Sequence, residues 1–320
     1  MNYFKLLFIS SLILFLALGS CCGEDINGTD ATSQSDAGTF SELQNLINES
    51  SKGSAINLTK DYLSGEGDNF PEGIEINKSI TINGNNHVID ANSKSRIFFV
   101  TSPSNVVINN IIFVNGKADV YGGAYLSDFG GTINNCVFKD NSAIAGGAVL
   151  AVGGKINNST FINNSAVDGG AVYQNKGSIY ACTFIDNSAE FGGAVYQLNS
   201  SVHDSTFLNN HAYYGGAVYQ EDSNVYSSTF ENNSADVHGG AVYQESGNVY
   251  GSTFLNNYAG LDCDDICNAS NHDDMDEDDF IGIIPSNSQN KGIDFDGNDA
   301  GNPIGLLILV LFVLAIRTKK

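Results

Sequence analysis

The chain has 320 residues, among them 35 glycines, 14 tyrosines and 19 phenylalanines but no tryptophan. Disordered Gly-rich chains seldom contain so many aromatic side chains, so this composition excludes general disorder and favours a long repeat array. The formal net charge at pH 7 is −22, which repels polyanions and argues against nucleic acid as a partner.

The first 22 residues have the build of a secretory signal. Lys5 precedes an apolar run over residues 6–18, and small residues follow it. This pattern predicts that residues 1–22 are a signal peptide and that the mature protein leaves the cytoplasm. The four residues that end at Cys21 also resemble a bacterial-type lipobox, so lipidation of Cys21 is an alternative outcome of processing.

A short helix is expected after a polar, flexible linker over residues 23–37. Thr39 and Glu42 have the spacing of a capping box, in which each side chain satisfies a backbone N–H group at the start of a helix. The apolar residues that follow fall on one helical face, and they are Phe40, Leu43, Leu46 and Ile47. This amphipathic helix would cover the open edge of the first coil of a repeat stack.

Irregular strands follow the helix. They are predicted near residues 55–58, 73–76, 79–82, 87–90 and 96–100. Together with the regular repeats that begin at residue 105, they give about eight or nine coils in one domain over residues 38–260.

A repeat of about 23 residues governs residues 105–260. Its phenylalanines are Phe113, Phe138, Phe161, Phe184, Phe207, Phe230 and Phe254. Glycine pairs recur at the same interval, each followed by alanine, at residues 122–123, 146–147, 169–170, 192–193, 215–216 and 239–240. A glycine pair marks a sharp bend or a close approach to another backbone segment.

An asparagine stands three residues after each phenylalanine from the second repeat onward. These residues are Asn141, Asn164, Asn187, Asn210, Asn233 and Asn257. Asparagine tolerates left-handed turns, and its amide both donates and accepts hydrogen bonds. Copies stacked at the strand spacing of about 4.8 Å can bond amide to amide, which predicts an asparagine ladder along the stack.

The remaining positions of the repeat predict strands and turns and no helix. The residue five before each phenylalanine is Ile or Val, the residue two before it is small or apolar, and a threonine usually separates that residue from the phenylalanine. This alternation assigns the threonine to the solvent face of a strand. Stacked units of this kind predict an all-β, right-handed parallel β-helix, because parallel crossovers are right-handed in nearly all proteins.

The combination of Gly-Gly-Ala-Val with Phe-x-x-Asn resembles the repeat of chlamydial polymorphic outer-membrane proteins. It is still more similar to the repeats of adhesin-like surface proteins of methanogenic archaea. The resemblance covers roughly residues 38–260, and it implies a pectin-lyase-like β-helix that is exported to the cell surface. The chlamydial family ends in an outer-membrane β-barrel, whereas this chain has one short apolar segment at residues 304–316, which favours the archaeal comparison.

The C-terminal part predicts a stalk and an anchor. Residues 261–303 are acidic and read as a solvated linker, residues 304–316 as a single transmembrane anchor and residues 317–320 as a basic cytoplasmic tail. Thirteen helical residues reach only ~20 Å, short of a hydrocarbon core of ~30 Å, so the anchor must snorkel its lysines or thin the bilayer. The alternative is a sorting signal that is cleaved. The expected location is the extracellular face of the cell membrane.

The cysteines divide into two groups. Cys136 and Cys182 share one column two coils apart, a separation of ~9.6 Å that is too long for a disulfide, so buried thiols are expected. Cys263 and Cys267 can bridge a small loop. A zinc site there would need two more ligands, of which only His272 is at hand, and we expect no metal and no cofactor.

Tyrosine columns are the candidate ligand-binding surface. The residues that follow Gly-Gly-Ala-Val are Tyr173, Tyr196, Tyr219 and Tyr243, and a second set four residues before the phenylalanine is Tyr180, Tyr226 and Tyr250. Because neighbours in a strand face opposite ways, we expect Val172 inside and Tyr173 outside. Outward rings would form rows able to stack on sugars or to hold a partner protein. The alternative is a stabilising tyrosine ladder without a ligand.

Ten asparagines have the N-glycosylation pattern Asn-x-Ser/Thr. They are Asn27, Asn48, Asn57, Asn77, Asn157, Asn158, Asn163, Asn199, Asn232 and Asn268. An Asn- and Ser-rich repeat generates this pattern by chance, but outward asparagines of an exported protein can still be modified, and we expect some of them to be.

Catalysis is not expected. Asp140 and Asp186 share a turn column at a distance compatible with an acid pair, but asparagines alternate with them, which is typical of turns. His203, His211 and His238 occupy different columns. The sequence therefore predicts a non-catalytic adhesin-like protein that binds surfaces, glycans or proteins of other cells. The alternatives are a cell-envelope spacer and a polysaccharide lyase or hydrolase.

Overall fold

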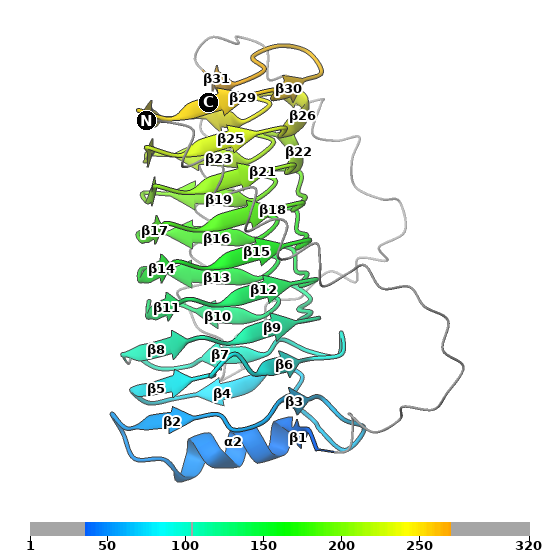
Figure 1. Cartoon of the computed structure of the whole chain (residues 1–320), viewed down its shortest axis with the longest axis vertical. Coiled ribbons are helices and arrows are strands. Elements are labelled where there is room, and N and C mark those ends of the chain that lie inside the picture. The colour runs from blue at the N-terminus through cyan, green and yellow to red at the C-terminus, as the bar shows by residue number, and fades with distance from the viewer. Residues whose placement is uncertain (1–35, 104, 270–320) are drawn as a thin grey trace, which may run out of the picture. The chain divides into compact units, whose positions relative to one another are not determined.

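The computed structural model describes residues 36–103 and 105–269, which form a parallel β-solenoid with one short helix at its N-terminal end (Figure 1). The predicted signal peptide at 1–22, the anchor at 304–316 and the basic tail at 317–320 lie outside the described residues, as do most of the linker and of the acidic stalk. In the described part of the chain, no helix has the length and apolar character needed to span a membrane.

Four parallel sheets run along the stack. Sheet A contains β1 (Gly38–Thr39), β3 (Tyr62–Leu63), β6 (Val88–Asp90), β9 (Ile112–Val114), β12 (Val137–Lys139), β15 (Thr160–Ile162), β18 (Thr183–Ile185), β21 (Thr206–Leu208), β25 (Thr229–Glu231) and β29 (Thr253–Leu255). Sheet B contains β2 (Ala55–Asn57), β5 (Ile80–Asn83), β8 (Val106–Asn109), β11 (Thr132–Asn134), β14 (Lys155–Asn157), β17 (Ser178–Tyr180), β20 (Ser201–His203), β24 (Ser223–Tyr226) and β28 (Gly247–Tyr250). Sheet C contains β4 (Ile74–Ile76), β7 (Phe98–Val100), β10 (Tyr125–Ser127), β13 (Val149–Val152), β16 (Val172–Asn175), β19 (Val195–Leu198), β23 (Val218–Glu221), β27 (Val242–Gln244) and β31 (Ile266–Asn268). The small sheet D contains β22 (His211–Tyr214), β26 (Ser234–His238) and β30 (Tyr258–Ala259).

Residues one repeat apart are direct neighbours in the sheets. Phe161 pairs with Phe184 in sheet A, and their rings stack with centroids 4.8 Å apart. Val172 pairs with Val195 in sheet C in the same way. Each repeat position therefore forms a vertical file, which is the arrangement that the 23-residue period predicts.

The interior is filled by the files that the alternation assigned to it. The phenylalanines of sheet A, the valines of sheet C and the isoleucines and valines of sheet B make one continuous buried core. The small residues that lie two positions before each phenylalanine also point into the interior. They form hydrogen bonds between neighbouring coils, as where the Cys136 backbone N–H donates to Ser159 Oγ at 3.1 Å. The polar threonines of sheet A are partly exposed.

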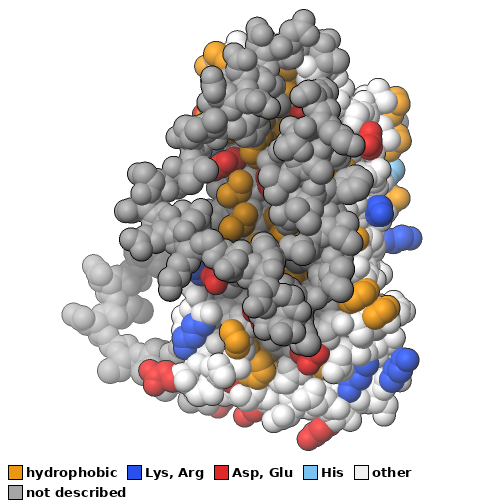
Figure 2. All heavy atoms as spheres, turned by 180° about the vertical axis from the view of Figure 1, so that it is seen from behind, with side chains coloured by type: hydrophobic (Ala, Val, Ile, Leu, Met, Phe, Trp, Pro, Cys, Tyr) orange, Lys and Arg blue, Asp and Glu red, His pale blue; other side chains and the backbone are white. Residues whose placement is uncertain are grey.

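The N-terminal end is closed by helix α2 (Phe40–Glu49). Thr39 is its N-cap, and its side chain accepts a hydrogen bond from the Glu42 backbone N–H at 3.1 Å, as the capping box predicts. Phe40, Leu43 and Ile47 are buried against the first coils. On the face that Figure 2 shows, acidic and basic side chains are interspersed at this end of the solenoid. Lys60 forms an ion pair with Glu42 of the helix at 2.7 Å.

Two expectations about the extent of the stack are wrong. The solenoid continues past residue 260, because β31 pairs with β27 and adds a further strand to sheet C. Cys267 of β31 occupies the position of Tyr243 one coil earlier, so a locally acidic sequence still supplies a buried residue at the required place. Sheet A has ten strands, more than the eight or nine coils expected, because the short β1 and β3 extend it at the capped end. The right hand of the coil stays a prediction.

Candidate binding surface

The asparagines that follow the phenylalanines are hydrogen-bonded along the interior of the stack. Asn164 Nδ2 donates to Asn187 Oδ1 at 3.0 Å, and the Asn164 backbone N–H donates to the same oxygen at 3.0 Å. The second Nδ2 hydrogen bonds to the carbonyl of Phe138 at 3.1 Å. The same pattern joins the six ladder residues from Asn141 to Asn257, all of them buried.

Left-handed backbone occurs one residue before each ladder asparagine and not at the ladder itself. Asn163 has φ 52° and Asp140 has φ 57°, and Asp186 lies in the same file with φ 54°. Asn163 Nδ2 donates to Asp140 Oδ1 at 2.6 Å, so the carboxylate serves as an acceptor in a stacked turn. Asp140 and Asp186 therefore belong to the turn chemistry that the alternation with asparagine indicates.

The two glycines of each pair have different reasons to be glycine. Gly169 has φ +64°, a conformation that strains residues with a side chain. A Cβ atom on Gly170 would lie 2.1 Å from the carbonyl oxygen of Gly193 in the next coil. The pair thus provides both a left-handed turn and a close approach between neighbouring coils.

The tyrosines of the Val-Tyr-Gln strands are buried, which corrects the expectation that their rings face solvent. Tyr173, Tyr196, Tyr219 and Tyr243 are 4%, 2%, 5% and 0% exposed. Their rings do point away from the main core, opposite to the valines, and they stack on one another at 4.9–5.2 Å. They form a second core outside sheet C, so they cannot contact a large ligand in this conformation.

Aromatic residues of the segments between sheets A and C cover these tyrosines. Phe191 meets Tyr219 edge to face at 5.4 Å, and Tyr214 of sheet D meets Tyr243 at 5.4 Å. The Tyr219 hydroxyl donates to Glu245 at 2.6 Å, and the Tyr196 hydroxyl donates to Glu221. Burial, with the nearby carboxylates, holds the pKa of both phenols well above the usual value.

An exposed aromatic row lies instead on sheet B. Tyr180, His203, Tyr226 and Tyr250 occupy one outward file, and their rings stack in sequence with centroids 4.5, 4.7 and 5.2 Å apart. Tyr180 is 37% exposed and Tyr250 is 49% exposed. Partial burial lowers the pKa of the His203 imidazole, an effect that Asp204 opposes. We call these four residues the aromatic row.

The aromatic row continues a file of asparagines in the earlier coils. Asn157 Nδ2 donates to Asn134 Oδ1 at 2.8 Å, and the same bonds run down through Asn109 and Asn83 to Asn57. The sequence pattern did not lead us to expect this outer asparagine row, although its members follow the inward Ile at a constant spacing. The file changes from amide ladder to ring stack between Asn157 and Tyr180.

The geometry of the aromatic row determines what it can contact. The rings of His203 and Tyr226 are covered on both faces by their neighbours in the stack, so they present their edges to solvent. Tyr250 differs, because β28 is the last strand of sheet B in the described part of the chain and no further ring lies on its outer face there. Within the described chain, the aromatic row therefore presents a series of ring edges to solvent and one accessible ring face, that of Tyr250.

A buried glutamine row was also not expected. Gln174, Gln197 and Gln220 follow the tyrosines and point into the main core, where all three are 0% exposed. Gln197 Nε2 donates to Gln220 Oε1 at 2.9 Å. The sequence signal was available, since residues two apart in a strand share a face, and a glutamine two after the inward Val must also point inward.

The cysteines lie as their columns predict. Cys136 and Cys182 are free and buried, and burial raises the pKa of each thiol to about 12. Cys263 and Cys267 form a disulfide. His272 lies outside the described residues.

Nine of the ten glycosylation candidates lie in the described chain, and none of them is buried. Asn48, Asn57, Asn77, Asn158, Asn163, Asn199 and Asn232 are exposed, and Asn157 and Asn268 are half-buried. Asn157 Nδ2 already donates to Asn134 and Asn163 Nδ2 to Asp140, while Asn57 and Asn268 each accept a hydrogen bond through Oδ1. Asn27 lies outside the described residues. Modification of these positions stays a prediction.

Comparison with known protein families finds a similar repeat. The family model of the Chlamydia polymorphic membrane protein repeat matches residues 158–175, 204–221 and 227–245. These three segments are therefore similar to the Chlamydia polymorphic membrane protein repeat. Each match begins near a strand of sheet A and ends one residue after Val-Tyr-Gln of sheet C, so it contains both the ladder asparagine and the glycine pair. Comparison with curated proteins and with solved structures gave no significant match. A β-helix of such repeats is typical of surface proteins.

Proposed function

We propose that this chain is a non-catalytic, adhesin-like surface protein that binds neutral glycans of other cells through the aromatic row. The exposed stack from Tyr180 to Tyr250 carries the proposal, since clustered exposed rings are typical of recognition surfaces. The repeats support the surface location, and the resemblance to adhesin-like proteins of methanogenic archaea supports the role.

The polarity around the aromatic row favours a neutral carbohydrate. The second outward file of the same four strands is Ser178, Ser201, Asn224 and Asn248. These two files contain no carboxylate, in a chain with a net charge of −22. Asp204, which follows His203 after the end of β20, is the acidic residue that acts on the row. Apolar ring edges beside hydroxyl and amide groups match a sugar, which has apolar C–H faces and a rim of hydroxyls. The open face of Tyr250 provides the place where a sugar ring can stack.

The terminal segments support a proposal for where the protein is attached. We propose that residues 1–22 direct export and that residues 304–316 hold the solenoid at the outer face of the membrane, with residues 261–303 as the connection. Lipidation at Cys21 would supply a second attachment. The solenoid would then project the aromatic row away from the cell.

A structural spacer is the second candidate. The burial of Tyr173, Tyr196, Tyr219 and Tyr243 favours it, because this column stabilises the rod without offering a surface to a ligand. A spacer would need no recognition surface at all, and the aromatic row would then be only a stabilising stack.

Binding of the full chain to a glycan array tests the proposal. We expect binding to at least one class of neutral glycan, and we expect it to weaken at least tenfold in Tyr250→Ala and in Tyr180→Ala. Tyr258→Ala is the matched control, since Tyr258 is also an exposed tyrosine, 61% accessible, but lies in sheet D.

Three outcomes would contradict the proposal. An array without any bound glycan would favour the spacer. Equal binding by wild type and both row variants would place the ligand elsewhere on the solenoid. Release of unsaturated or reducing sugar ends during incubation would instead indicate a lyase or hydrolase.

A further inference from the structure

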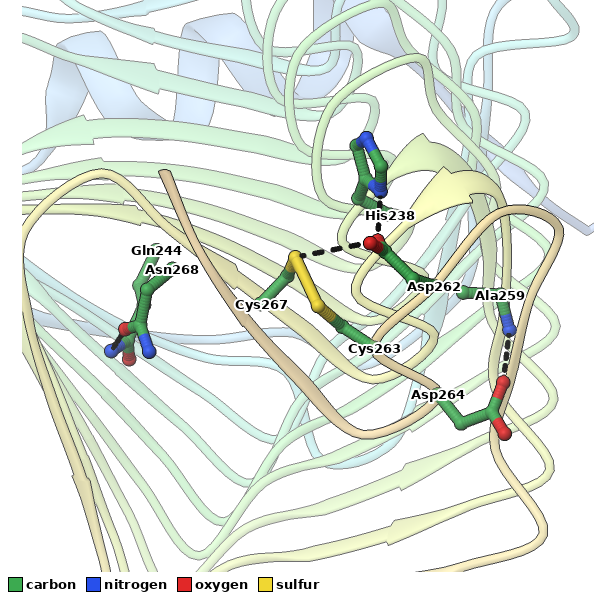
Figure 3. Close-up of a disulfide and its surroundings, with 8 residues drawn as sticks. All are labelled: His238, Gln244, Ala259, Asp262, Cys263, Asp264, Cys267 and Asn268. Atoms are coloured by element: carbon green, nitrogen blue, oxygen red, sulfur yellow. Dashed lines mark hydrogen bonds and ion pairs between the residues drawn. A yellow bond between two sulfur atoms is a disulfide. The ribbon is translucent and has the colours of Figure 1, made fainter. Parts of the chain in front are cut away.

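Four potential metal ligands meet at the C-terminal end of the described solenoid (Figure 3). His238 belongs to β26, Asp262 and Cys263 belong to the segment that leads into β31, and Cys267 lies in β31 itself. A ligand atom of His238, one of Asp262 and the Cys267 sulfur all lie within 4.8 Å of one another. Cys263 is bonded to Cys267, so its sulfur is adjacent to the same cluster.

The kinds of ligand atom in this cluster indicate which metal ion would bind there. Two thiolates, one imidazole and one carboxylate are ligands that zinc takes in tetrahedral sites, and thiolates disfavour the hard cations calcium and magnesium. We propose that these four residues bind one Zn²⁺ ion when the Cys263–Cys267 disulfide is reduced. Oxidation and metal binding are then alternative states of the same end of the solenoid.

The chemistry balances without an unnamed reactant. A dithiol reductant supplies two electrons and two protons to the disulfide, which becomes two thiols while the reductant becomes a disulfide. Zn²⁺ then displaces the two thiol protons and binds both sulfurs, a neutral imidazole nitrogen and a carboxylate oxygen, so two protons are released to solvent. Oxidation of the two thiolates by a disulfide oxidant reverses the sequence and expels the ion.

The surroundings hold the ligands at the required place. Asp264 Oδ1 accepts a hydrogen bond from the Ala259 backbone N–H at 2.9 Å, and Asp265 Oδ1 accepts one from Asn257 Nδ2 at 3.1 Å. These hydrogen bonds attach the segment from Cys263 to Cys267, called the cysteine loop, to β30 and to the last asparagine of the ladder. Cys267 is 0% exposed and the His238 side chain is 16% exposed, whereas the Asp262 side chain is 47% exposed, so solvent reaches the carboxylate.

The oxidised disulfide and the reduced, zinc-bound form would connect different residues of the chain. The disulfide joins residues only four positions apart. A bound zinc ion would also join His238 to the cysteine loop and thus link neighbouring coils at the edge of the stack. We therefore expect zinc to stabilise the last coils against unfolding in the reduced protein and to have no such effect in the oxidised protein.

Cobalt substitution in the reduced full chain tests the site. We expect one equivalent of Co²⁺ to give thiolate-to-cobalt charge-transfer absorption and intense tetrahedral ligand-field bands, which zinc then abolishes by displacing the cobalt. His238→Gln and Asp262→Asn, which retain both cysteines, should weaken cobalt binding at least tenfold. His211→Gln is the matched control, because His211 Nε2 lies 3.7 Å from Asp236 Oδ2 but near no cysteine of the cluster.

Stability provides an independent measurement. Zinc should raise the unfolding temperature of the reduced wild type but not of reduced His238→Gln. The proposal is overturned if cobalt gives no thiolate charge-transfer band. It is also overturned if His238→Gln and Asp262→Asn bind cobalt as tightly as the wild type does, or if the oxidised chain binds it equally well.

Discussion

Val172 and Tyr173 are consecutive residues of β16 that are both buried, although their side chains point to opposite faces of sheet C. Val172 packs in the main core, and Tyr173 belongs to the second core, where its ring stacks on that of Tyr196. The strand therefore separates two apolar compartments, and its outer face contributes to stability rather than to recognition.

The tyrosine column should be as important for stability as an interior file. We expect Tyr196→Ala to lower the free energy of unfolding by on the order of 3–5 kcal/mol, the usual cost of deleting a large buried aromatic side chain. Tyr196→Phe, which loses only the bond to Glu221, should cost about 1 kcal/mol. Urea unfolding followed by circular dichroism measures both values. A cost for Tyr196→Ala no larger than that of the exposed Tyr258→Ala would show that the second core contributes nothing.

The buried and the outer asparagine rows should respond differently to the same substitution. Asn187→Ala leaves the Asn164 backbone N–H without its acceptor and the Phe161 carbonyl without an amide donor, inside the protein. We expect a loss of about 3 kcal/mol. Asn83→Ala removes similar amide bonds where water can replace them, so it should cost less than ~1 kcal/mol. Equal urea midpoints for the two variants would contradict a structural role specific to the buried ladder.

The second glycine of the pair should tolerate no side chain. In Gly170→Ala the new Cβ would lie 2.1 Å from the Gly193 carbonyl oxygen and 2.5 Å from that of Ser188, so the coils must separate, and we expect a loss of about 3 kcal/mol. Gly67→Ala is the control, because no atom lies within 4 Å of the place that its Cβ would take, and its effect should stay within ~0.5 kcal/mol. Thermal unfolding of the two variants separates these cases. A stable Gly170→Ala variant would mean that neighbouring coils are not in tight contact.

Much of the fold could be predicted because a fixed period places identical residues one above another. The files of Phe161 and Phe184, and the capping of α2 by Thr39, depend only on spacing and on local chemistry. The outer asparagine row and the buried glutamine row followed from the same alternation but were overlooked. The end of the solenoid was predicted one strand too early, because the acidic residues before Cys267 resemble a solvated linker.

The candidate surface was predicted less well than the fold. Alternation assigns Tyr173 and Tyr180 to outward positions alike, but it does not say what lies over each face. Tyr173 belongs to the second core with Phe191 and Tyr214, which come from the following coils, whereas nothing comparable covers Tyr180 in the described chain.

The amino-acid sequence by itself therefore determined the coil, its interior and the direction in which each side chain leaves its strand, because these depend on period and alternation. Only the tertiary structure decided which outward rings stay accessible, and only it brought His238 near Cys267, since both depend on how segments of different coils fold over one another.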